Sequence, residues 1–451
     1  MEHTVRIILR KLDKYAVGIM IMMGVVFYFV PGQWICFEDD SWTYLGLKGL
    51  EGGLYLLYPL FLGFFRRILG EHYFLNGVVV VQSVLAIICT LLFVNTLRKR
   101  FKLQGWECIL LYAACMLPFS IYLPEAGITH YILTEGVTYS LFYIYFLFLL
   151  NFVLDRRYKW AIGLLIMSLC LMFTRSQLII LLLTTFAAFI YVAIRKIRNR
   201  KTVVKVISLS VGLAIAVGWL FVTGLRTQKI NLPQFTAILM IKGFYEVDYE
   251  DKELFDTPVM QEIFERVYNA VDEKGYRYAY ARQDLYMWQD LLCDRIIFVA
   301  REEIGQYLSE HPEVKLGTSE IVWELGSTVL FRHFGRYLYH VLRLLMPGFI
   351  AAVFFQIQPI YLLCHFIALF IYIYAIVGSI ICIRYKRNRC VSEYMLTTVC
   401  FILIMIVTVN LVFVGAQRYV VYAMGIFYCA AYLLFKELIM MCLDKIKSRD
   451  I

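Results

Sequence analysis

Charged side chains are scarce in this chain of 451 residues: Asp, Glu, Lys and Arg make up 17% of it, and hydrophobic residues make up 61%. A soluble domain is typically about 25% charged and about 45–50% apolar. The mean hydropathy is +0.69, and the apolar residues come in long runs. The scarcity of charge excludes a soluble globular protein and predicts an integral membrane protein that crosses the bilayer many times.

Several motifs of soluble enzymes are also absent. No GxGxxG or Walker pattern offers a glycine-rich loop for a nucleotide phosphate, and no HExxH or zinc-ligand spacing occurs. None of the 12 cysteines forms a CxxC pair, and most lie inside apolar runs, where Cys acts as a small hydrophobic residue. No internal repeat and no Pro-, Gly- or Ser-rich linker divides the chain. These absences disfavour a nucleotide-sugar enzyme, a zinc protein and a string of linked modules.

The apolar runs are long enough to cross a membrane. A helix needs roughly 20 apolar residues to span the hydrocarbon core, and fewer when its ends snorkel. The predicted spans are residues 15–30, 77–97, 108–123, 132–154, 160–173, 178–194, 206–222, 360–383, 395–414 and 419–442. The weakest of them is 160–173. We therefore predict an all-α polytopic membrane protein with ten transmembrane helices.

Basic residues cluster in alternate connections between these runs. The clusters lie at both termini and at residues 98–100, 156–159, 195–198 and 384–387. The positive-inside rule assigns such clusters to the cytoplasm. Both termini are therefore predicted to be cytoplasmic in a cell membrane, as an even number of spans requires. The net charge of +10 follows mainly from this topology, so it does not imply a nucleic-acid partner.

The outer segment between the first two predicted spans is longer than a simple turn requires. Residues 31–76 contain stretches around 45–53 and 60–69 that suit amphipathic helices lying on the membrane surface. Residues 338–355 are apolar enough to span, but counting them as a span would put the basic cluster at 384–389 outside. We therefore assign 338–355 to the interface or to a re-entrant position.

The largest outer segment, residues 224–337, differs in composition from the rest of the chain. It holds 19 of the 34 acidic residues. Apolar residues recur at helical spacing in 259–272 and 285–301, with charges between them. This pattern predicts a small, mainly helical external domain between an N-terminal membrane region, 1–223, and a C-terminal one, 338–451.

Two adjacent carboxylates, Asp39 and Asp40, lie just beyond the outer end of the first predicted span. Neighbouring carboxylates at a membrane boundary repel each other and hold water strongly, so the pair suits a divalent metal ion or a general base. A solvated loop that marks the end of a helix explains the pair equally simply. The pair by itself leaves both interpretations open.

Further polar residues are predicted to reach the same outer side. Glu135 begins the fourth span, close to His130. Arg175 occupies the turn between the fifth and sixth spans, and Arg418 the turn before the last. Each Arg alone is explained by a helix-end side chain that snorkels to the interface. Ionisable groups this close to hydrocarbon usually face a cavity or a partner, so together they predict a site for an anionic ligand and a reacting hydroxyl.

The order of these polar residues is similar to that of a known family. The first outer loop reads Glu38-Asp39-Asp40-Ser41-Trp42-Thr43-Tyr44, followed by Leu57-Tyr58-Pro59-Leu60-Phe61-Leu62 and Val81-Gln82-Ser83-Val84-Leu85. This order resembles the opening of polytopic GT-C glycosyltransferases of the family 39 type, which include protein O-mannosyltransferases and lipid A aminoarabinose transferases. Thr134-Glu135, Arg175 and Gln417-Arg418-Tyr419 also follow in the family's order. The family's usual Asp-Glu pair is Asp-Asp here.

The resemblance implies a GT-C-like fold and a transfer reaction on the outer side of the membrane. Such enzymes move a sugar from a polyprenyl-phosphate carrier to an acceptor hydroxyl outside the cytoplasm. The expected partners are therefore a polyprenyl-phosphate-linked sugar, an acceptor glycan, lipid or protein of the cell envelope, and the bilayer itself. The external domain would shape the acceptor site.

The resemblance also implies roles for the candidate residues. Asp40 would be the general base on the acceptor hydroxyl. Asp39 or Glu135 would assist by orienting the acceptor, and Asp39 with Asp40 could hold a divalent cation such as Mg²⁺, Mn²⁺ or Ca²⁺. The residues that would bind the donor phosphate are Arg175, Arg418 and His130.

Other functions stay open at this point. A polymerase or ligase of surface polysaccharide would use a polyprenyl-diphosphate donor on the same side. A transporter or lipid flippase places ionisable residues near the bilayer midplane and often has two related halves, whereas the predicted spans carry almost no charge inside and show no repeat. A purely structural membrane partner is the simplest alternative. The transferase is the leading hypothesis.

Overall fold

The structure is a computed structural model that describes residues 2–30, 32–46, 56–121, 126–195, 212, 232–277, 294–354, 361–385, 388–412 and 417–447. Within these ranges the chain is helical apart from turns, and the only extended pairing is an isolated bridge between Cys36 and Tyr131. The all-α prediction is confirmed for this part of the chain. The predicted span 206–222, apart from Gly212, and the stretches 47–53 and 285–293 lie outside the described residues.

The chain divides into two compact units. The first unit contains Met1–Lys229, Leu369–Ile404 and Val421–Ile451, and the second contains Ile230–Ala368 and Met405–Val420. Each unit is therefore built from segments that are distant in the sequence.

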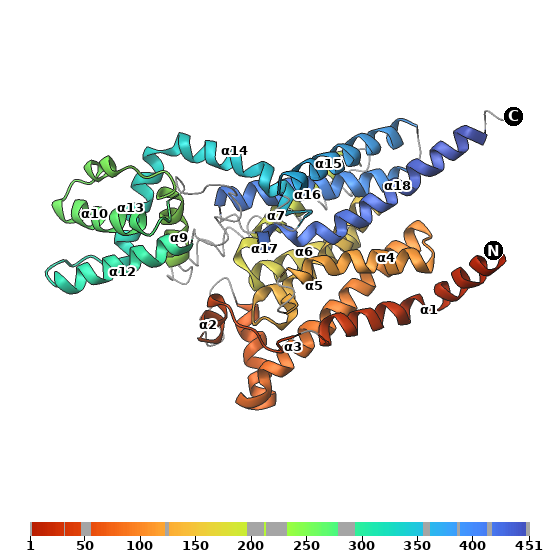
Figure 1. Ribbon diagram of the computed structural model, residues 1–451, viewed down its shortest axis with the longest axis horizontal. Helices are drawn as coiled ribbons and strands as arrows, with labels where there is room; N and C mark the ends of the chain where they lie inside the picture. Colours follow the sequence, from red (N-terminus) through yellow and green to blue (C-terminus); the bar gives the residue numbers. More distant parts are fainter. Residues whose placement is uncertain are drawn as a thin grey trace. The chain divides into compact units, whose positions relative to one another are not determined.

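The first unit is a bundle of long apolar helices. Its helices are α1 (Glu2–Phe29), α2 (Asp39–Gly46), α3 (Leu57–Phe101), α4 (Gly105–Met116), α5 (Thr134–Asp155), α6 (Tyr158–Thr174), α7 (Ile180–Arg195), α18 (Met424–Lys447) and the larger parts of α15 (Tyr361–Arg384) and α16 (Arg389–Val412). In Figure 1, α3 packs on α5, α5 on α6, and both α1 and α18 on α4.

Seven described helices are long and apolar enough to cross a membrane. They are Lys11–Phe29, Leu57–Phe101, Thr134–Asp155, Gln177–Arg195, Leu363–Arg384, Arg389–Leu411 and Gln417–Ile446. Two shorter apolar helices, Gly105–Ser120 and Tyr158–Thr174, coincide with the third and fifth predicted spans. These lengths and compositions are those of a multi-pass membrane protein, as the sequence predicts.

Helix α5 forms the core of the first unit. It packs against α3, α6 and α7, so it is apolar around its whole circumference, as expected of a buried helix. Phe142 and Phe146 are fully buried, and the Tyr143 ring lies 5.3 Å from that of Phe93, a spacing at which aromatic rings attract each other. Glu135 lies in the first turn of α5 and Asp155 in its last. Because α5 runs through the bundle, these two residues lie at its opposite ends.

The basic clusters of the sequence meet at one end of the first unit. Arg100 of α3 donates to Asp155 at 2.6 Å. Arg156, which follows the last residue of α5, donates to Glu393 of α16 at 3.3 Å. Arg195 ends α7 beside α16. Cations at helix C-termini are stabilised by the partial negative charge of the terminal carbonyls. We call this end of the bundle the basic end.

The second unit is a smaller helical assembly. It contains α9 (Leu232–Gly243), α10 (Pro258–Glu273), α12 (Asp294–Glu310), α13 (Thr318–Arg332), α14 (Phe334–Ala351), α17 (Gln417–Val420) and the remaining ends of α15 and α16. Thr257 caps α10 by accepting from the Met260 N–H at 3.2 Å, a favourable start for a helix. A Cβ atom at Gly326 of α13 would lie 2.5 Å from the Met240 nitrogen of α9, so glycine is what permits these two helices to pack so closely.

Helix α14 covers most of the stretch 338–355 and is apolar on two faces. Val341 and Leu344 are buried within the second unit, whereas Leu338, Leu342 and Met346 are exposed. An exposed apolar face on such a helix suits the membrane interface, the position predicted for it from sequence.

Candidate functional site

The loop between α1 and α2 is fastened to the chain just before α5. The Cys36 N–H donates to the His130 carbonyl at 2.9 Å, and the Ile132 N–H donates to the Cys36 carbonyl at 3.0 Å. These two bonds form the isolated bridge between Cys36 and Tyr131. They bring the segment that leads into α2 beside the segment that leads into α5, at the end of the bundle opposite the basic end.

The two predicted carboxylates, Asp39 and Asp40, form the first turn of α2. Their backbone is described, but their side chains lie outside the described atoms. The turn is closed by Ser41, which is buried: its hydroxyl accepts from the Glu38 N–H at 2.9 Å, and its own N–H donates to the Glu38 carbonyl at 2.8 Å. Asp39 and Asp40 thus start a helix three residues after the bridge at Cys36.

A buried ion pair joins the start of α5 to the end of α6. Arg175 Nη1 contacts Glu135 Oε2 and also donates to the Thr134 hydroxyl at 2.8 Å, while that hydroxyl donates to Glu135 Oε2 at 3.0 Å. Glu135 is completely buried and the Arg175 side chain is 5% exposed. Burying two charges is costly unless each compensates the other. The structure therefore brings together two of the residues singled out in the sequence.

A hydrogen-bond network holds the segment before α5 in place. Tyr58 donates to Gln82 Oε1 at 3.1 Å, and the Gln82 amide donates to the carbonyls of Thr129 and Tyr131 at 2.8 and 3.2 Å. A Cβ atom at Gly136 would lie 2.7 Å from the Gln82 amide, so a glycine in α5 leaves room for this side chain. Tyr58 and Gln82 thus position the backbone that precedes Glu135.

His130 lies in this same segment with its ring completely buried. Its Nδ1 is 3.0 Å from the Gln33 carbonyl and its Nε2 is 2.5 Å from the Tyr28 carbonyl. The ring therefore ties the end of α1 and the loop between α1 and α2 to the segment before α5. To bind a donor phosphate, as predicted, an imidazole nitrogen would have to leave one of these carbonyls.

Arg418 belongs to α17 in the second unit. Its Nη2 donates to the Tyr419 hydroxyl at 3.1 Å, and its guanidinium lies 5.1 Å from the centre of the Tyr419 ring. A shared pocket for Arg418 and Glu135 stays a prediction, as does the phosphate-binding role of Arg418.

No group of three or more His, Cys, Asp or Glu side chains among the described residues could hold a metal ion. The proposed metal ligands Asp39 and Asp40 are outside that set. Divalent-cation binding by these carboxylates therefore stays a prediction.

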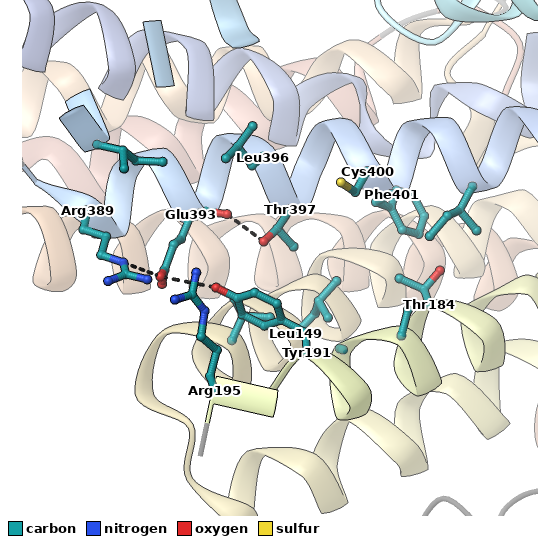
Figure 2. Close-up of a pocket in the computed structure, with 15 residues that line it drawn as sticks. Leu149, Thr184, Tyr191, Arg195, Arg389, Glu393, Leu396, Thr397, Cys400 and Phe401 are labelled. Carbon is teal, nitrogen blue, oxygen red and sulfur yellow. Dashed lines mark hydrogen bonds and ion pairs between the residues drawn. The ribbon is translucent and has the colours of Figure 1, made fainter. Parts of the chain in front are cut away.

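A second candidate site lies at the basic end of the first unit. A cavity of about 360 Å³ is bounded by α5, α7 and α16, with Ile383 of α15 at its margin. Figure 2 shows Tyr191 and Arg195 of α7 on one side of it and Arg389 and Glu393 of α16 on the other. Most of the remaining lining is apolar: Leu149, Val153, Ala187, Ala188, Leu396, Phe401 and Ile404.

Glu393 organises the polar side of this cavity. Its Oε1 accepts from Arg389 at 2.8 Å, from Arg156 at 3.3 Å and from the Tyr191 hydroxyl at 3.3 Å. The Glu393 side chain is 10% exposed, and the Arg195 guanidinium lies 5.5 Å from the centre of the Tyr191 ring. One carboxylate thus binds cations from two helix ends, Arg156 and Arg389, at the polar side of an apolar cavity that Arg195 also lines.

Family models, curated proteins and solved structures give no match to this chain. The functional interpretation therefore depends on the geometry of the two sites and on the pattern of the sequence.

The sequence interpretation missed the cavity at the basic end. It treated the basic residues of 384–389 as a topology signal and gave Glu393 no role. A lone acid one helical turn after Arg389, at the start of an apolar run, is the signal that could have marked the site, because a carboxylate in that position needs compensating partners.

The arrangement at the opposite end suits chemistry with anionic and hydroxyl groups. A helix that starts with two carboxylates, Asp39 and Asp40, is fastened to the segment before α5. Glu135 and Arg175 form a charge pair at the start of α5. Carboxylates can accept a proton or orient a hydroxyl, and a guanidinium fork binds phosphate oxygens well.

Proposed function

We propose that this protein is a membrane glycosyltransferase that moves a sugar from a polyprenyl-phosphate carrier to an acceptor hydroxyl of the cell envelope. One observation carries the proposal: the bridge at Cys36 joins the helix that starts with Asp39 and Asp40 to the segment that ends at the buried Glu135–Arg175 pair. Carboxylates and a guanidinium are thereby brought to the end of the bundle opposite the basic end. A lipid-borne donor is the substrate class that an apolar bundle of this kind can reach within the bilayer.

The proposed mechanism divides the work among these residues. Asp40 removes the proton of the acceptor hydroxyl as the sugar carbon is attacked, and the carrier phosphate leaves with the pair of electrons of the broken bond. General-base catalysis of this kind contributes roughly 10²–10⁴-fold to the rate. Asp39 orients the acceptor or shares a divalent cation with Asp40.

The leaving phosphate requires positive charge. A guanidinium has five N–H donors in a fixed fork, enough to hold both Glu135 and a phosphate oxygen, so Arg175 can serve both groups. In this mechanism Glu135 fixes the orientation of Arg175. Negative charge builds up on the phosphate as its bond to the sugar breaks. A cation beside the phosphate stabilises this charge and so lowers the activation barrier.

The proposal is tested by mass analysis of the cell envelope in cells that contain or lack this protein. We expect a sugar of fixed mass to be missing from an envelope polymer, lipid or protein when the chain is absent, and to return with the wild-type chain. Asp40→Asn should not restore it, at unchanged protein level in the membrane. Glu71→Gln, a matched change at an exposed carboxylate of α3 that pairs with Arg66 at 3.2 Å, should restore it fully.

Two results would count against the proposal. An envelope with identical glycans in the presence and absence of the chain would overturn the transferase assignment. Full restoration by Asp40→Asn would remove Asp40 as the base. A missing polymer of many repeats, with its single repeating unit still present on the lipid, would instead identify a polysaccharide polymerase.

A further inference from the structure

The cavity at the basic end lies within helices that are long and apolar enough to cross a membrane. α5, α7 and α16 all belong to that group. Its volume of about 360 Å³ falls in the range of roughly 300–1,000 Å³ that is usual for sites of small molecules. An apolar cavity among transmembrane helices borders hydrocarbon rather than water, so a lipid chain is the occupant that can enter it without loss of hydration.

The lining of the cavity changes from polar to apolar along α16. Arg389 and Glu393 line one end, and Phe401, near the other end, is followed along the helix by Ile404, which also lines the cavity. With a rise of about 1.5 Å per residue, Glu393 and Ile404 are separated by about 16 Å along the helix axis. A polar head at one end and an elongated apolar space behind it match the shape of a lipid with its chain inserted between helices.

The charge at the polar end is positive. Arg195 and Arg389 line this end with one carboxylate, Glu393, so two positive charges face one negative charge and one remains in excess. An anionic head group would balance this excess, and guanidinium groups bind phosphate through paired N–H donors. A zwitterionic or neutral head group would leave the excess uncompensated.

We propose that this cavity binds an anionic phospholipid of the bilayer, with one acyl chain between α5, α7 and α16 and its phosphate on Arg195 and Arg389. The basic end is the end that the positive-inside rule assigns to the cytoplasm, and basic pockets between transmembrane helices on that side are suited to anionic head groups. A polyprenyl phosphate is the less suitable occupant, because the proposed transfer site needs its phosphate at the opposite end of the bundle. The preference for a phospholipid over a polyprenyl phosphate rests on the transferase proposal, whereas the lipid site itself does not.

The test uses the purified full-length protein in a neutral detergent, with bound lipid counted by native mass spectrometry. Phosphatidylglycerol and phosphatidylcholine with identical acyl chains are the probes. We expect saturable binding of phosphatidylglycerol at least about five-fold tighter than of phosphatidylcholine, since one favourable cation near an anionic head group is worth about that factor. Arg195→Gln should lower phosphatidylglycerol affinity about five-fold and leave phosphatidylcholine unchanged.

Matched variants separate the site from a general effect of charge or bulk. Lys159→Gln is the charge control: this lysine also lies over an aromatic ring, that of Trp160 at 4.6 Å, but does not line the cavity. Ala187→Trp fills the cavity and should abolish phosphatidylglycerol binding. Ile190→Trp adds the same bulk to an exposed position of α7 outside the lining and should leave binding unchanged. The thermal unfolding midpoint of each variant checks that it is folded.

Each other outcome overturns the proposal. Equal affinity for the two phospholipids, or equal loss with Arg195→Gln and Lys159→Gln, would show that the cavity does not select an anionic head group. Binding that survives Ala187→Trp in a folded protein would put the lipid elsewhere. Displacement of phosphatidylglycerol by a ten-fold lower concentration of polyprenyl phosphate would identify the carrier, rather than a phospholipid, as the occupant. Should Ala187→Trp fail to fold, the head-group preference of the wild type and its loss in Arg195→Gln decide the matter.

Discussion

The buried pair of Glu135 and Arg175 offers a sharp test of what holds α5 and α6 together. Glu135→Gln leaves the Arg175 cation buried without its counter-ion, and Arg175→Met leaves the Glu135 carboxylate in the same position. Because Glu135 is completely buried and the Arg175 side chain is only 5% exposed, water can do little to compensate either charge. Breaking a buried pair from one side costs about 3–5 kcal/mol.

The double substitution is expected to behave differently from the sum of the single ones. When both charges are removed, no uncompensated charge is left, and a buried pair replaced by well-packed neutral side chains is often close to neutral in stability. The Thr134 hydroxyl, which accepts from Arg175 at 2.8 Å, loses a donor in both Arg175 variants. We therefore expect the double variant to lose less stability than the two single variants together, by a coupling free energy of at least about 3 kcal/mol.

The measurement is reversible unfolding of the full-length protein in mixed detergent micelles, followed by circular dichroism. The control is the exposed pair of Arg66 and Glu71, at 3.2 Å with side chains 37% and 74% exposed, where single substitutions should cost at most about 1 kcal/mol. Additive effects of Glu135→Gln and Arg175→Met, or losses no larger than those of the control pair, would refute the reasoning that this ion pair is buried and mutually compensated.

Three further predictions concern close packing and pH. Gly136→Ala puts a Cβ 2.7 Å from the Gln82 amide and should destabilise the protein by about 1–3 kcal/mol; an unchanged unfolding midpoint would mean that Gln82 moves freely. In Gly326→Ala the new Cβ would lie 2.5 Å from the Met240 nitrogen, and this backbone atom cannot move aside as a flexible side chain could. We therefore expect protease to cleave the second unit faster than in the wild type. An equal rate of cleavage would contradict this packing. Burial, aided by neighbouring cations, lowers the pKa of His340 from its usual value near 6.5 to about 3. As the pH falls, the imidazole of His340 is therefore protonated in the unfolded chain before it is protonated in the folded one. The stability that His340 contributes is complete above about pH 6.5 and is lost towards pH 3, at about 1.4 kcal/mol per pH unit. Unfolding midpoints between pH 4 and 7 should depend less on pH in His340→Phe than in the wild type, and identical slopes would exclude His340 as the group.

Much of the fold follows from local composition. The weakest predicted span, 160–173, is a helix in the structure, α6, because a run of apolar residues in a bilayer satisfies its backbone only by hydrogen bonding within itself. The amphipathic stretch 60–69 is likewise helical within α3, which has non-helical backbone at Gly70 before the long apolar run begins. In both cases the signal lies within a few residues of the structure it specifies.

The candidate sites depend on contacts that no local signal carries. Glu135 and Arg175 stand out in the sequence as separate ionisable residues in apolar surroundings, yet only the packing of α5 against α6 makes them partners. The sequence assigns Glu393 no special role, because Arg389 lies four residues before it on the same helix. Such a pair is ordinary on a helix surface. Its other partners, Tyr191 and Arg156, are 202 and 237 residues away in the sequence.

The sequence by itself determined that this protein is a bundle of membrane-spanning helices with basic residues in alternate connections, because hydropathy and charge act over one helix or one loop at a time. Only the tertiary structure decided that Arg175 neutralises Glu135, that Cys36 fastens the Asp39–Asp40 helix to the start of α5, and that Arg156 joins Arg389 on Glu393. The physical reason is that such meetings depend on how each helix is rotated and which neighbour it packs against. These are set by the fit of many side chains across the bundle rather than by any one segment.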